Sequence, residues 1–304
     1  MTGGVRHFRT LLDTERDELN AILDRADVLK RARGTAAHPR PLADKSVVIL
    51  LEKASTRTRV SFEVGVTELG GFSITLIAKD TQLGRGEPLE DTARMFSGYA
   101  HAVVYRTFGH DRIEALARHA SIPIVNGLSE DYHPCQLLAD LQTVRAHHGR
   151  LEGVRAAWIG DGNNMAHSWI LAAARTGLVL RLACPEGYEP RADIVERARD
   201  LGADVAVVRD PREAAEGAGV VTTDVWASMG QEAENAARRE AFDGYQVNAA
   251  LMGAASPEGI FLHCLPAHRG EEVSGEVIDG PRSCVWEEAE NRLHAQKALL
   301  EWLL

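Results

Sequence analysis

Short apolar runs alternate with amphipathic segments along almost the whole chain. Segments rich in Val, Ile, Leu and Ala predict strands at 47–51, 72–77, 102–106, 123–126, 156–160, 179–183, 205–208, 220–224 and 259–263. Between them, apolar residues recur at helical spacing, as at 89–99, 112–120 and 194–201. Apolar strands that alternate with helices are typical of parallel sheets covered by helices on both faces.

The pattern restarts near residue 150. The segment "HHGRLEGVR" closes one helix before a new series of strands begins, and 304 residues is long for a single core. We therefore expect an α/β protein of two domains, 1–150 and 151–285, each a parallel sheet with helices on both faces. Helices should join them, with the amphipathic segment 286–304 packing back toward the first domain.

Polar side chains that could bind a ligand or take part in catalysis lie where the predicted strands end. They are residues 55–59 after the first strand, Arg106 on the third, His133 after the fourth, Asn163 and Asn164 after the fifth, Asp224 on the eighth and Cys264 after the ninth. Because the carboxyl ends of parallel strands share one edge, and ligands of such sheets bind there, this edge is the expected site.

Composition narrows the class of protein. A net charge of −10 argues against a nucleic-acid partner, which requires a basic face. The four cysteines form neither a disulfide framework nor a C-x-x-C zinc motif. Neither a secretory pattern nor a run of about 18 apolar residues is present, so we expect a soluble cytoplasmic protein without a membrane partner.

The stretch "STRTR" opens a helix with hydrogen-bond donors. Ser55 or Thr56 could be an ordinary cap, but a cation at a helix N-terminus opposes the helix dipole unless an anion binds there. The side chains of Arg57 and Arg59 point to nearly opposite faces. We therefore assign Arg57 to a phosphate group and Arg59 to a structural ion pair.

The segment "HPCQ" opens a second helix, with Pro134 suited to its first position. His133 and Gln136 are three residues apart, so both can reach one point above the helix end. A capping histidine beside a surface glutamine is an equally good interpretation of this segment alone. Zinc binding is disfavoured, because no second ligand pair follows.

Three further segments are ambiguous by themselves. "GDGNN" lacks the third glycine of a dinucleotide-binding turn, and Asn164 there suits either a small carboxylate or a helix cap. Asp224 in "TDVWASMG" suits an ammonium group or an Asx turn. Cys264 in "FLHCLPAHRG" lacks an evident activating base, because the neighbouring His263 should point to the other face of the strand, and the Leu265–Pro266 bond could be cis.

Taken in order, "STRTRVSFE", "HPCQLLADLQT", "GDGNNMAHS", "DVWASMGQE" and "HCLPAHRGEEV" resemble the ornithine carbamoyltransferases. The resemblance spans the chain from about residue 45 to its C-terminal helix. S-T-R-T-R and H-P-x-Q mark carbamoyltransferases generally, whereas S-M-G and H-C-L-P point to the ornithine branch.

The resemblance implies roles for individual residues. It assigns carbamoyl phosphate to Ser55, Thr56, Arg57, Thr58, Gln82, Arg106, His133, Gln136, Cys264, Leu265 and Arg292. It assigns ornithine to Asn164, Asp224, Ser228 and Met229. Catalytic roles fall to Arg106, His133, Cys264 and Arg292, and Gln82 is expected to enter a neighbouring subunit's site in a homotrimer.

The implied reaction transfers the carbamoyl group of carbamoyl phosphate to the δ-amine of L-ornithine, as in arginine biosynthesis. Direct attack with stabilisation of the oxyanion requires no metal, cofactor or covalent intermediate. A lysine-like pKa near ~10.4 leaves roughly one amine in a thousand neutral at pH 7, so the rate should rise with pH.

Other interpretations compete with this one. An aspartate acceptor would need extra cations, whereas putrescine and acetylated ornithine are opposed only by the fit of Asn164 to a free carboxylate and of Asp224 to a free ammonium. A nicotinamide-dependent dehydrogenase and a non-catalytic phosphate sensor are the more distant alternatives. The segment 230–246 is a hypothetical lid over the acceptor.

Overall fold

The structure, a computed structural model, describes residues 4–227 and 235–304. The chain divides into two compact units, one formed by Met1–Ala139 with Asn291–Leu304 and the other by Asp140–Glu290. The chain passes between the units twice, within helix α5 (Pro134–His148) and within helix α12 (Val285–Leu303). The expected fold class, two parallel α/β sheets with joining helices, is confirmed.

The first unit contains a four-stranded parallel sheet of order β2-β1-β3-β4. Its strands are β1 (Ser46–Leu51), β2 (Phe72–Ile77), β3 (Ala102–Arg106) and β4 (Ile124–Leu128). The chain builds from β1 first to one side and then to the other. The carboxyl ends of β1 and β3 are therefore a topological switch point, where open α/β sheets bind ligands.

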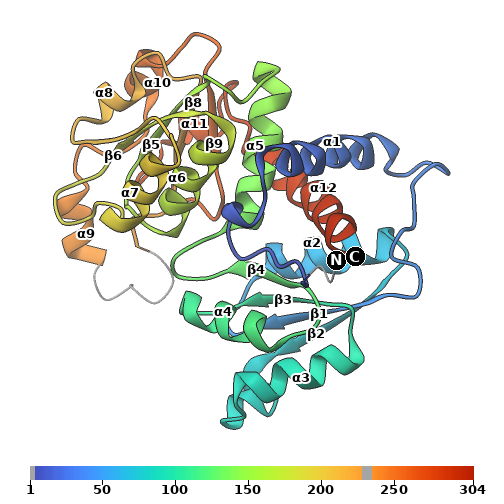
Figure 1. The fold of residues 1–304 in the computed structure, drawn as a ribbon. Helices are drawn as coiled ribbons and strands as arrows, with labels where there is room; N and C mark the ends of the chain where they lie inside the picture. The colour runs from blue at the N-terminus through green and yellow to red at the C-terminus, as the bar shows by residue number, and fades with distance from the viewer. Residues whose placement is uncertain (1–3, 228–234) are drawn as a thin grey trace. The chain divides into compact units, whose positions relative to one another are not determined.

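Helices cover both faces of this sheet (Figure 1). On one face, α3 (Leu89–Tyr99) and α4 (His110–His119) pack on inward side chains such as Val48 and Tyr105. On the other face, α2 (Thr56–Glu68) carries Gly65, where an added Cβ would lie 3.2 Å from Cγ of Lys297 on α12. That close approach explains the glycine.

The N-terminal forty residues belong to the first unit. Phe8 pairs with Val125 of β4 in a parallel bridge, and its N–H donates to Ile124 O at 2.8 Å. Helix α1 (Arg16–Ala32) buries one apolar face, and its Lys30 donates to Asn291 Oδ1 on α12 at 2.8 Å. Short 3₁₀ turns at Leu11–Asp13, Ala78–Asp80 and Leu83–Arg85 complete the unit.

The second unit contains a five-stranded parallel sheet of order β7-β6-β5-β8-β9. Its strands are β5 (Arg155–Ile159), β6 (Val179–Ala183), β7 (Val205–Val208), β8 (Val220–Thr223) and β9 (Ile260–His263). Here the strand order reverses between β5 and β8. The ends of these two strands therefore form the second switch point.

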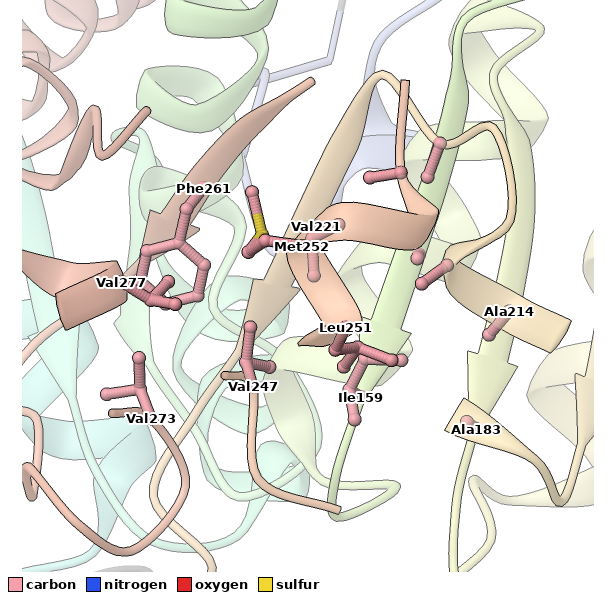
Figure 2. Packing of buried hydrophobic residues seen from close by; sticks show 14 of the residues in the cluster. Ile159, Ala183, Ala214, Val221, Val247, Leu251, Met252, Phe261, Val273 and Val277 are labelled. Atoms are coloured by element: carbon pink, nitrogen blue, oxygen red, sulfur yellow. The ribbon is translucent and has the colours of Figure 1, made fainter. Parts of the chain in front are cut away.

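The core of the second unit lies between this sheet and three short helices (Figure 2). Ile159, Val221 and Phe261 from the strands meet Leu251 and Met252. The three helices are α8 (Pro211–Ala215), α10 (Ala249–Ala254) and α11 (Gly275–Ile278). The remaining helices of the unit are α6 (Asn164–Thr176), α7 (Ala192–Asp200) and α9 (Asn235–Ala241). Among the described residues, no helix has the length and apolar character needed to cross a bilayer.

Candidate functional site

The switch point of the first unit begins with the N-terminus of α2. Ser55 is its N-cap, and the Ser55 side chain accepts a hydrogen bond from the backbone N–H of Thr58 at 3.2 Å. Thr56 and Arg57 are exposed, whereas Thr58 is buried. Arg59 forms an ion pair with Glu63 at 2.9 Å, which confirms its structural assignment. The exposed Arg57 thus remains beside helix N–H groups that favour an anion.

Arg106 ends β3 directly beside β1. Leu51 and Arg106 are partners in the parallel pairing, and the N–H of Glu52 donates to the Arg106 carbonyl at 2.9 Å. The Arg106 side chain is buried. The segments after β1 and at the end of β3 therefore share one edge of the sheet, as the sequence predicted.

Arg292 connects the predicted carbamoyl-phosphate residues within the first unit. Its Nη1 donates to Gln136 Oε1 at 2.7 Å and its Nη2 to Thr58 Oγ1 at 3.4 Å. Its Nε donates to Gln296 Oε1 at 2.8 Å, and Gln296 in turn donates to Ser61 Oγ at 2.7 Å. Arg292 is only 3% exposed, so a buried guanidinium is oriented by side chains of α2, α5 and its own helix α12.

The electrostatics of the first unit favour an anion. Burial lowers the pKa of His133 well below its usual value, and the charges of Arg292, Arg106 and Arg57 lower it further. His133 is therefore neutral at pH 7 and retains one N–H donor. Three guanidinium groups close enough to act on one imidazole form a cationic cluster whose charge a phosphate dianion would largely offset.

The sequence assigned no role to Glu52, which follows β1 and accepts hydrogen bonds from residues at the end of β3. Its carboxylate accepts from the Tyr105 hydroxyl at 2.9 Å, from Arg112 Nη2 at 2.6 Å and from the Thr107 hydroxyl. Burial acts to raise the pKa of Glu52, but the hydrogen bonds from Arg112, Thr107 and Tyr105 outweigh it and the pKa is lowered. Glu52 therefore holds the end of β3, next to Arg106, as a carboxylate.

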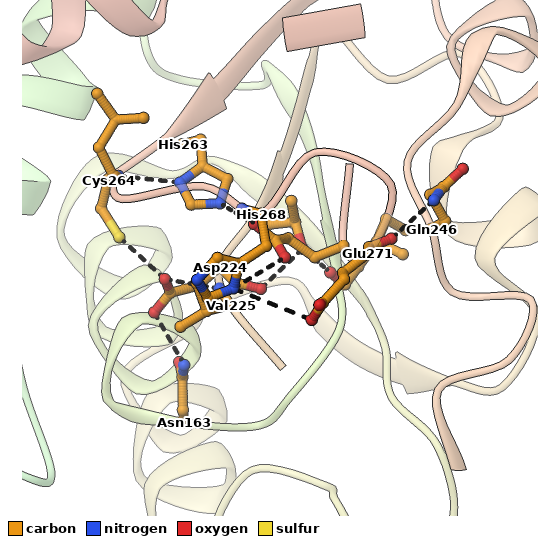
Figure 3. A network of polar contacts seen from close by, with 12 residues as sticks. Asn163, Asp224, Val225, Gln246, His263, Cys264, His268 and Glu271 are labelled. Atoms are coloured by element: carbon orange, nitrogen blue, oxygen red, sulfur yellow. Dashed lines mark hydrogen bonds and ion pairs between the residues drawn. The ribbon is translucent and has the colours of Figure 1, made fainter. Parts of the chain in front are cut away.

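Asp224 is the centre of the switch point in the second unit (Figure 3). Its Oδ2 accepts from Asn163 Nδ2 at 3.0 Å, and its Oδ1 accepts from the N–H of Val225 at 2.8 Å and from the Cys264 thiol at 3.2 Å. The ends of β5, β8 and β9 thus converge on one carboxylate. All of these partners are electrically neutral, so the Asp224 charge remains available to a cation.

The two asparagines of "GDGNN" have different positions. Asn163 is the N-cap of α6, and its Oδ1 accepts from the N–H groups of Met165 and Ala166 at 2.9 and 3.2 Å. Asn164 is the first residue of that helix and is half-buried. Asn163, which also binds Asp224, thus lies at the strand end where the sequence placed it, although the sequence assigned it no ligand.

Cys264 holds its proton. Burial raises the pKa of the Cys264 thiol well above its usual value, and Asp224 raises it further. The sequence placed His263 on the opposite face, yet His263, Cys264 and Asp224 present possible metal-ligand atoms within 4.8 Å of one another. His263 is nevertheless engaged elsewhere, because Nδ1 accepts from the N–H of Leu265 at 2.9 Å and Nε2 lies 3.2 Å from Glu272 Oε1. A thiolate nucleophile is therefore disfavoured.

The Leu265–Pro266 bond is cis, as the sequence allowed. Leu265 has φ 57°, a left-handed conformation that non-glycine residues seldom adopt. The hydrogen bond to His263 fixes the Leu265 N–H in this turn. This backbone therefore follows Cys264 in a defined conformation.

Comparisons with known proteins agree with this geometry. Residues 6–146 match the family model "Aspartate/ornithine carbamoyltransferase, carbamoyl-P binding domain", and residues 152–303 match "Aspartate/ornithine carbamoyltransferase, Asp/Orn binding domain". The chain belongs to the aspartate/ornithine carbamoyltransferase family. Among curated relatives, it is 56% identical to an ornithine carbamoyltransferase of Halorhodospira halophila, covering 99% of both chains. It is 54% identical to "Ornithine carbamoyltransferase, anabolic" of Pseudomonas aeruginosa, covering 99% of this chain and 97% of the relative.

Solved structures give the same result for the fold. The Pyrococcus furiosus ornithine carbamoyltransferase superposes with a TM-score of 0.93 at 46% identity, covering 98% of this chain and 96% of the other. The Thermus thermophilus ornithine carbamoyltransferase gives a TM-score of 0.90 at 42% identity, with 98% and 99% covered. The two-sheet architecture of this carbamoyltransferase is thus that of the ornithine branch.

The structure also explains why the second residue pair of "GDGNN" begins after a glycine, Gly162, without any need for a bound dinucleotide. A Cβ at Gly162 would lie 2.1 Å from the backbone N of Pro190. The close approach that a dinucleotide-binding turn reserves for pyrophosphate is used here by the chain itself. This packing removes the main support for a dehydrogenase.

Three further predicted residues are Gln82, Ser228 and Met229. Gln82 is exposed at the start of the turn Leu83–Arg85, where its carbonyl accepts from Arg85 and Glu87. Ser228 and Met229 lie outside the described residues, as do residues 230–234 of the hypothetical lid.

The described part of the lid segment is anchored by Arg238 of α9, another residue that the sequence did not identify. Arg238 Nη1 contacts Asp161 Oδ2 at 2.9 Å and the Trp226 carbonyl at 2.7 Å. A pocket of about 710 Å³ lies in the same unit and includes Trp226, Gln246 and Arg269 among its lining residues. Asp224 does not line it.

Proposed function

We propose that this chain is an ornithine carbamoyltransferase that forms L-citrulline and phosphate from L-ornithine and carbamoyl phosphate. The observation that carries the choice of acceptor is Asp224, a carboxylate surrounded by the neutral groups of Asn163, Val225 and Cys264. Such a site attracts the ammonium group of ornithine. An aspartate acceptor would require cations in this position.

The first unit would bind carbamoyl phosphate. The phosphate would lie on the first N–H groups of α2, with Ser55, Thr56 and Arg57 around it, because the helix dipole and the arginine both favour a dianion there. Arg106, neutral His133 and the Thr58 hydroxyl would donate to the carbonyl oxygen. Gln136, oriented by Arg292, would accept from the carbamoyl NH₂.

The second unit would bind ornithine. Asp224 would hold the α-ammonium group, and Asn164, at the N-terminus of α6, would hold the carboxylate. Ser228 and Met229 complete the acceptor site implied by the sequence. The protonated Cys264 thiol would lie beside the δ-amine, and the Leu265 carbonyl would accept from the carbamoyl NH₂.

The reaction proceeds by direct attack. The neutral δ-nitrogen forms a bond to the carbonyl carbon, and the negative charge that develops on oxygen is stabilised by Arg106, His133 and Thr58. The C–O bond to phosphate then breaks, and the proton lost from nitrogen leaves with phosphate. Arg292 acts by keeping Gln136 and Thr58 in position before the attack.

We place this enzyme in cytoplasmic arginine biosynthesis, as a homotrimer in which Gln82 enters a neighbouring site. The named relative of Pseudomonas aeruginosa is anabolic. Edge strand β2 exposes Phe72 and Ile74, which are 68% and 38% exposed, and the Gln82 turn follows this strand. Exposed apolar residues on a sheet edge are typical of an interface. The free thiol of Cys264 fits a reducing compartment.

A citrulline assay tests the reaction. Purified protein is supplied with carbamoyl phosphate and one of four acceptors, namely L-ornithine, L-aspartate, putrescine or N-acetylornithine. Citrulline formation should have the highest kcat/KM, and Asp224→Asn should weaken the binding of ornithine more than that of N-acetylornithine, which lacks the α-ammonium group. A preference for aspartate, or no turnover with any acceptor, contradicts the proposal.

A further inference from the structure

A second group of reactive side chains lies in the second unit and shares no residue with the cluster around Asp224. His147 is in the last turn of α5, Cys284 directly precedes α12, and Glu287 is in the first turn of α12. His147 Nε2 lies 2.8 Å from Glu287 Oε2 and 3.4 Å from Cys284 Sγ. The three possible ligand atoms all lie within 4.8 Å of one another.

The two His147 separations are close to those of a tetrahedral metal site. Zinc binds thiolate at about 2.3 Å and imidazole or carboxylate at about 2.0–2.2 Å, which sets the ligand atoms about 3.4–3.6 Å apart. The Sγ–Nε2 distance of 3.4 Å already fits. The Nε2–Oε2 distance of 2.8 Å needs to lengthen by only about half an ångström, within the reach of side chains that are 37% and 33% exposed.

An ordinary surface ion pair explains less of this arrangement. A histidine in the last turn of a helix is commonly placed by the helix dipole and by a nearby carbonyl. His148 has that role here, because its Nε2 lies 2.9 Å from the Gly219 carbonyl. His147 instead faces a thiol and a carboxylate, and the thiol contributes nothing to a pairing of histidine with glutamate.

We propose that His147, Cys284 and Glu287 form a binding site for Zn²⁺, with the fourth position open to water. A thiolate, an imidazole and a carboxylate together suit zinc better than the hard cations Mg²⁺ and Ca²⁺. Burial and the neighbouring Glu287 and Glu288 raise the pKa of Cys284 to about 11, so the metal-free thiol is protonated. Binding replaces that proton with the Zn–S bond and releases it to solvent.

The position of the site suggests a consequence for stability. The metal would link the end of α5 to the beginning of α12, the two helices within which the chain passes between its units. A cation that binds only the folded chain stabilises it in proportion to the logarithm of its free concentration. Zinc should therefore raise Tm.

Cobalt substitution identifies the ligands. The full-length protein, freed of metal with EDTA, is titrated with Co²⁺ while the thiolate-to-cobalt absorption band is recorded. The wild type should show this band, Zn²⁺ should displace it, and Cys284→Ser should abolish it. His147→Gln and Glu287→Gln should each weaken Co²⁺ binding by at least about tenfold, because even the loss of a residue that only supports a metal ligand lowers metal affinity by that factor.

Two matched controls separate this site from the alternatives. His148→Gln removes the neighbouring histidine, and Cys264→Ser removes the thiol beside Asp224; both should retain the band. No band in the wild type overturns the proposal, as does a band that survives Cys284→Ser but disappears with Cys264→Ser. A Tm of Cys284→Ser below that of the wild type in EDTA would mean that this substitution itself destabilises the fold. In that case the test rests on His147→Gln and Glu287→Gln, and wild-type Co²⁺ affinity in both of these variants refutes the site.

Discussion

Arg292 Nη1 donates to Gln136 Oε1 at 2.7 Å, although 156 positions separate these residues in the sequence. The same guanidinium reaches Thr58 and Gln296, so one buried cation sets the positions of two groups that we assign to the carbamoyl moiety. In the proposed reaction its value lies in geometry as well as charge.

Arg292→Lys tests that geometry. An ammonium group lacks the planar fork that contacts Gln136, Thr58 and Gln296 together, so kcat should fall by about 100-fold or more while the fold is retained. Arg25→Lys is the matched control, because Arg25 of α1 contacts Glu301, which is on the same helix as Arg292, at a partly exposed site. Steady-state kinetics check both variants, and a kcat for Arg292→Lys within about twofold of wild type would contradict the role.

Arg57 and Arg59 provide a matched pair on one helix turn. Arg57→Ala should lower kcat/KM for carbamoyl phosphate by about 10- to 150-fold, since a hydrogen bond to a charged group contributes about 1.5–3 kcal/mol. Arg59→Ala removes an exposed pair with Glu63 and should change kcat/KM by less than about twofold. Equal losses in the two variants would argue against phosphate binding by Arg57.

The nine predicted strands all occur, with boundaries within two residues of the observed ones. Their apolar character reflects burial on both faces, and that signal is local. The edge of the first sheet that carries Ser55 and Arg106, and the edge of the second sheet that carries Asp224, were predictable because parallel strands place their carboxyl ends together.

The missed residues depend on long-range contacts. Glu52 meets Arg112 and Arg238 meets Asp161, and no spacing within one segment reveals such pairs. Asn163 was placed at the sheet edge, and its capping role could also have been found from its own motif. In "GDGNN" the first asparagine stands where an N-cap is expected, directly before the helix, and that position turns its amide toward the end of β8.

The pH profile distinguishes the substrate amine from enzyme groups. Because burial and three arginines lower the pKa of His133 well below 6.5, its imidazole stays neutral from pH ~6 to ~9. The raised pKa of Cys264 keeps the thiol protonated over the same range. Below pH ~7.5 the α-ammonium group that Asp224 would bind stays charged, so only the δ-amine of ornithine should limit the rate and log kcat/KM for ornithine should rise by about one per pH unit. A plateau beginning near pH ~6.5 would show instead that His133 limits the rate.

Subunit mixing tests the shared site. Gln82→Ala and Arg57→Ala should each have strongly reduced activity alone. If Gln82 acts in a neighbouring subunit, each hybrid trimer combines an intact Arg57 with an intact Gln82 in about a third of its sites, so about a quarter of all sites are intact after random exchange. Activity should therefore increase when the two variants are dissociated together and reassembled. No increase, despite exchange verified by mass labelling, would place Gln82 in its own subunit's site or outside any site.

Glu52 should be important for stability because its carboxylate satisfies three partly buried donors. Glu52→Ala leaves the Tyr105 and Thr107 hydroxyls and the Arg112 guanidinium without this acceptor, so the free energy of unfolding should fall by about 2–4 kcal/mol. Glu130→Ala is the control, because Glu130 is 56% exposed and pairs only loosely with Lys53, and it should cost less than about 0.5 kcal/mol. Urea unfolding followed by circular dichroism measures both.

Since the pKa of Glu52 is lowered by folding, the contribution of Glu52 to the free energy of unfolding is present above pH ~4.5 and is lost as the pH falls through the folded pKa. The difference between wild type and Glu52→Ala should therefore shrink at acidic pH, and a difference that stays constant down to pH ~3 would mean that the carboxylate charge is not what stabilises this edge of the sheet.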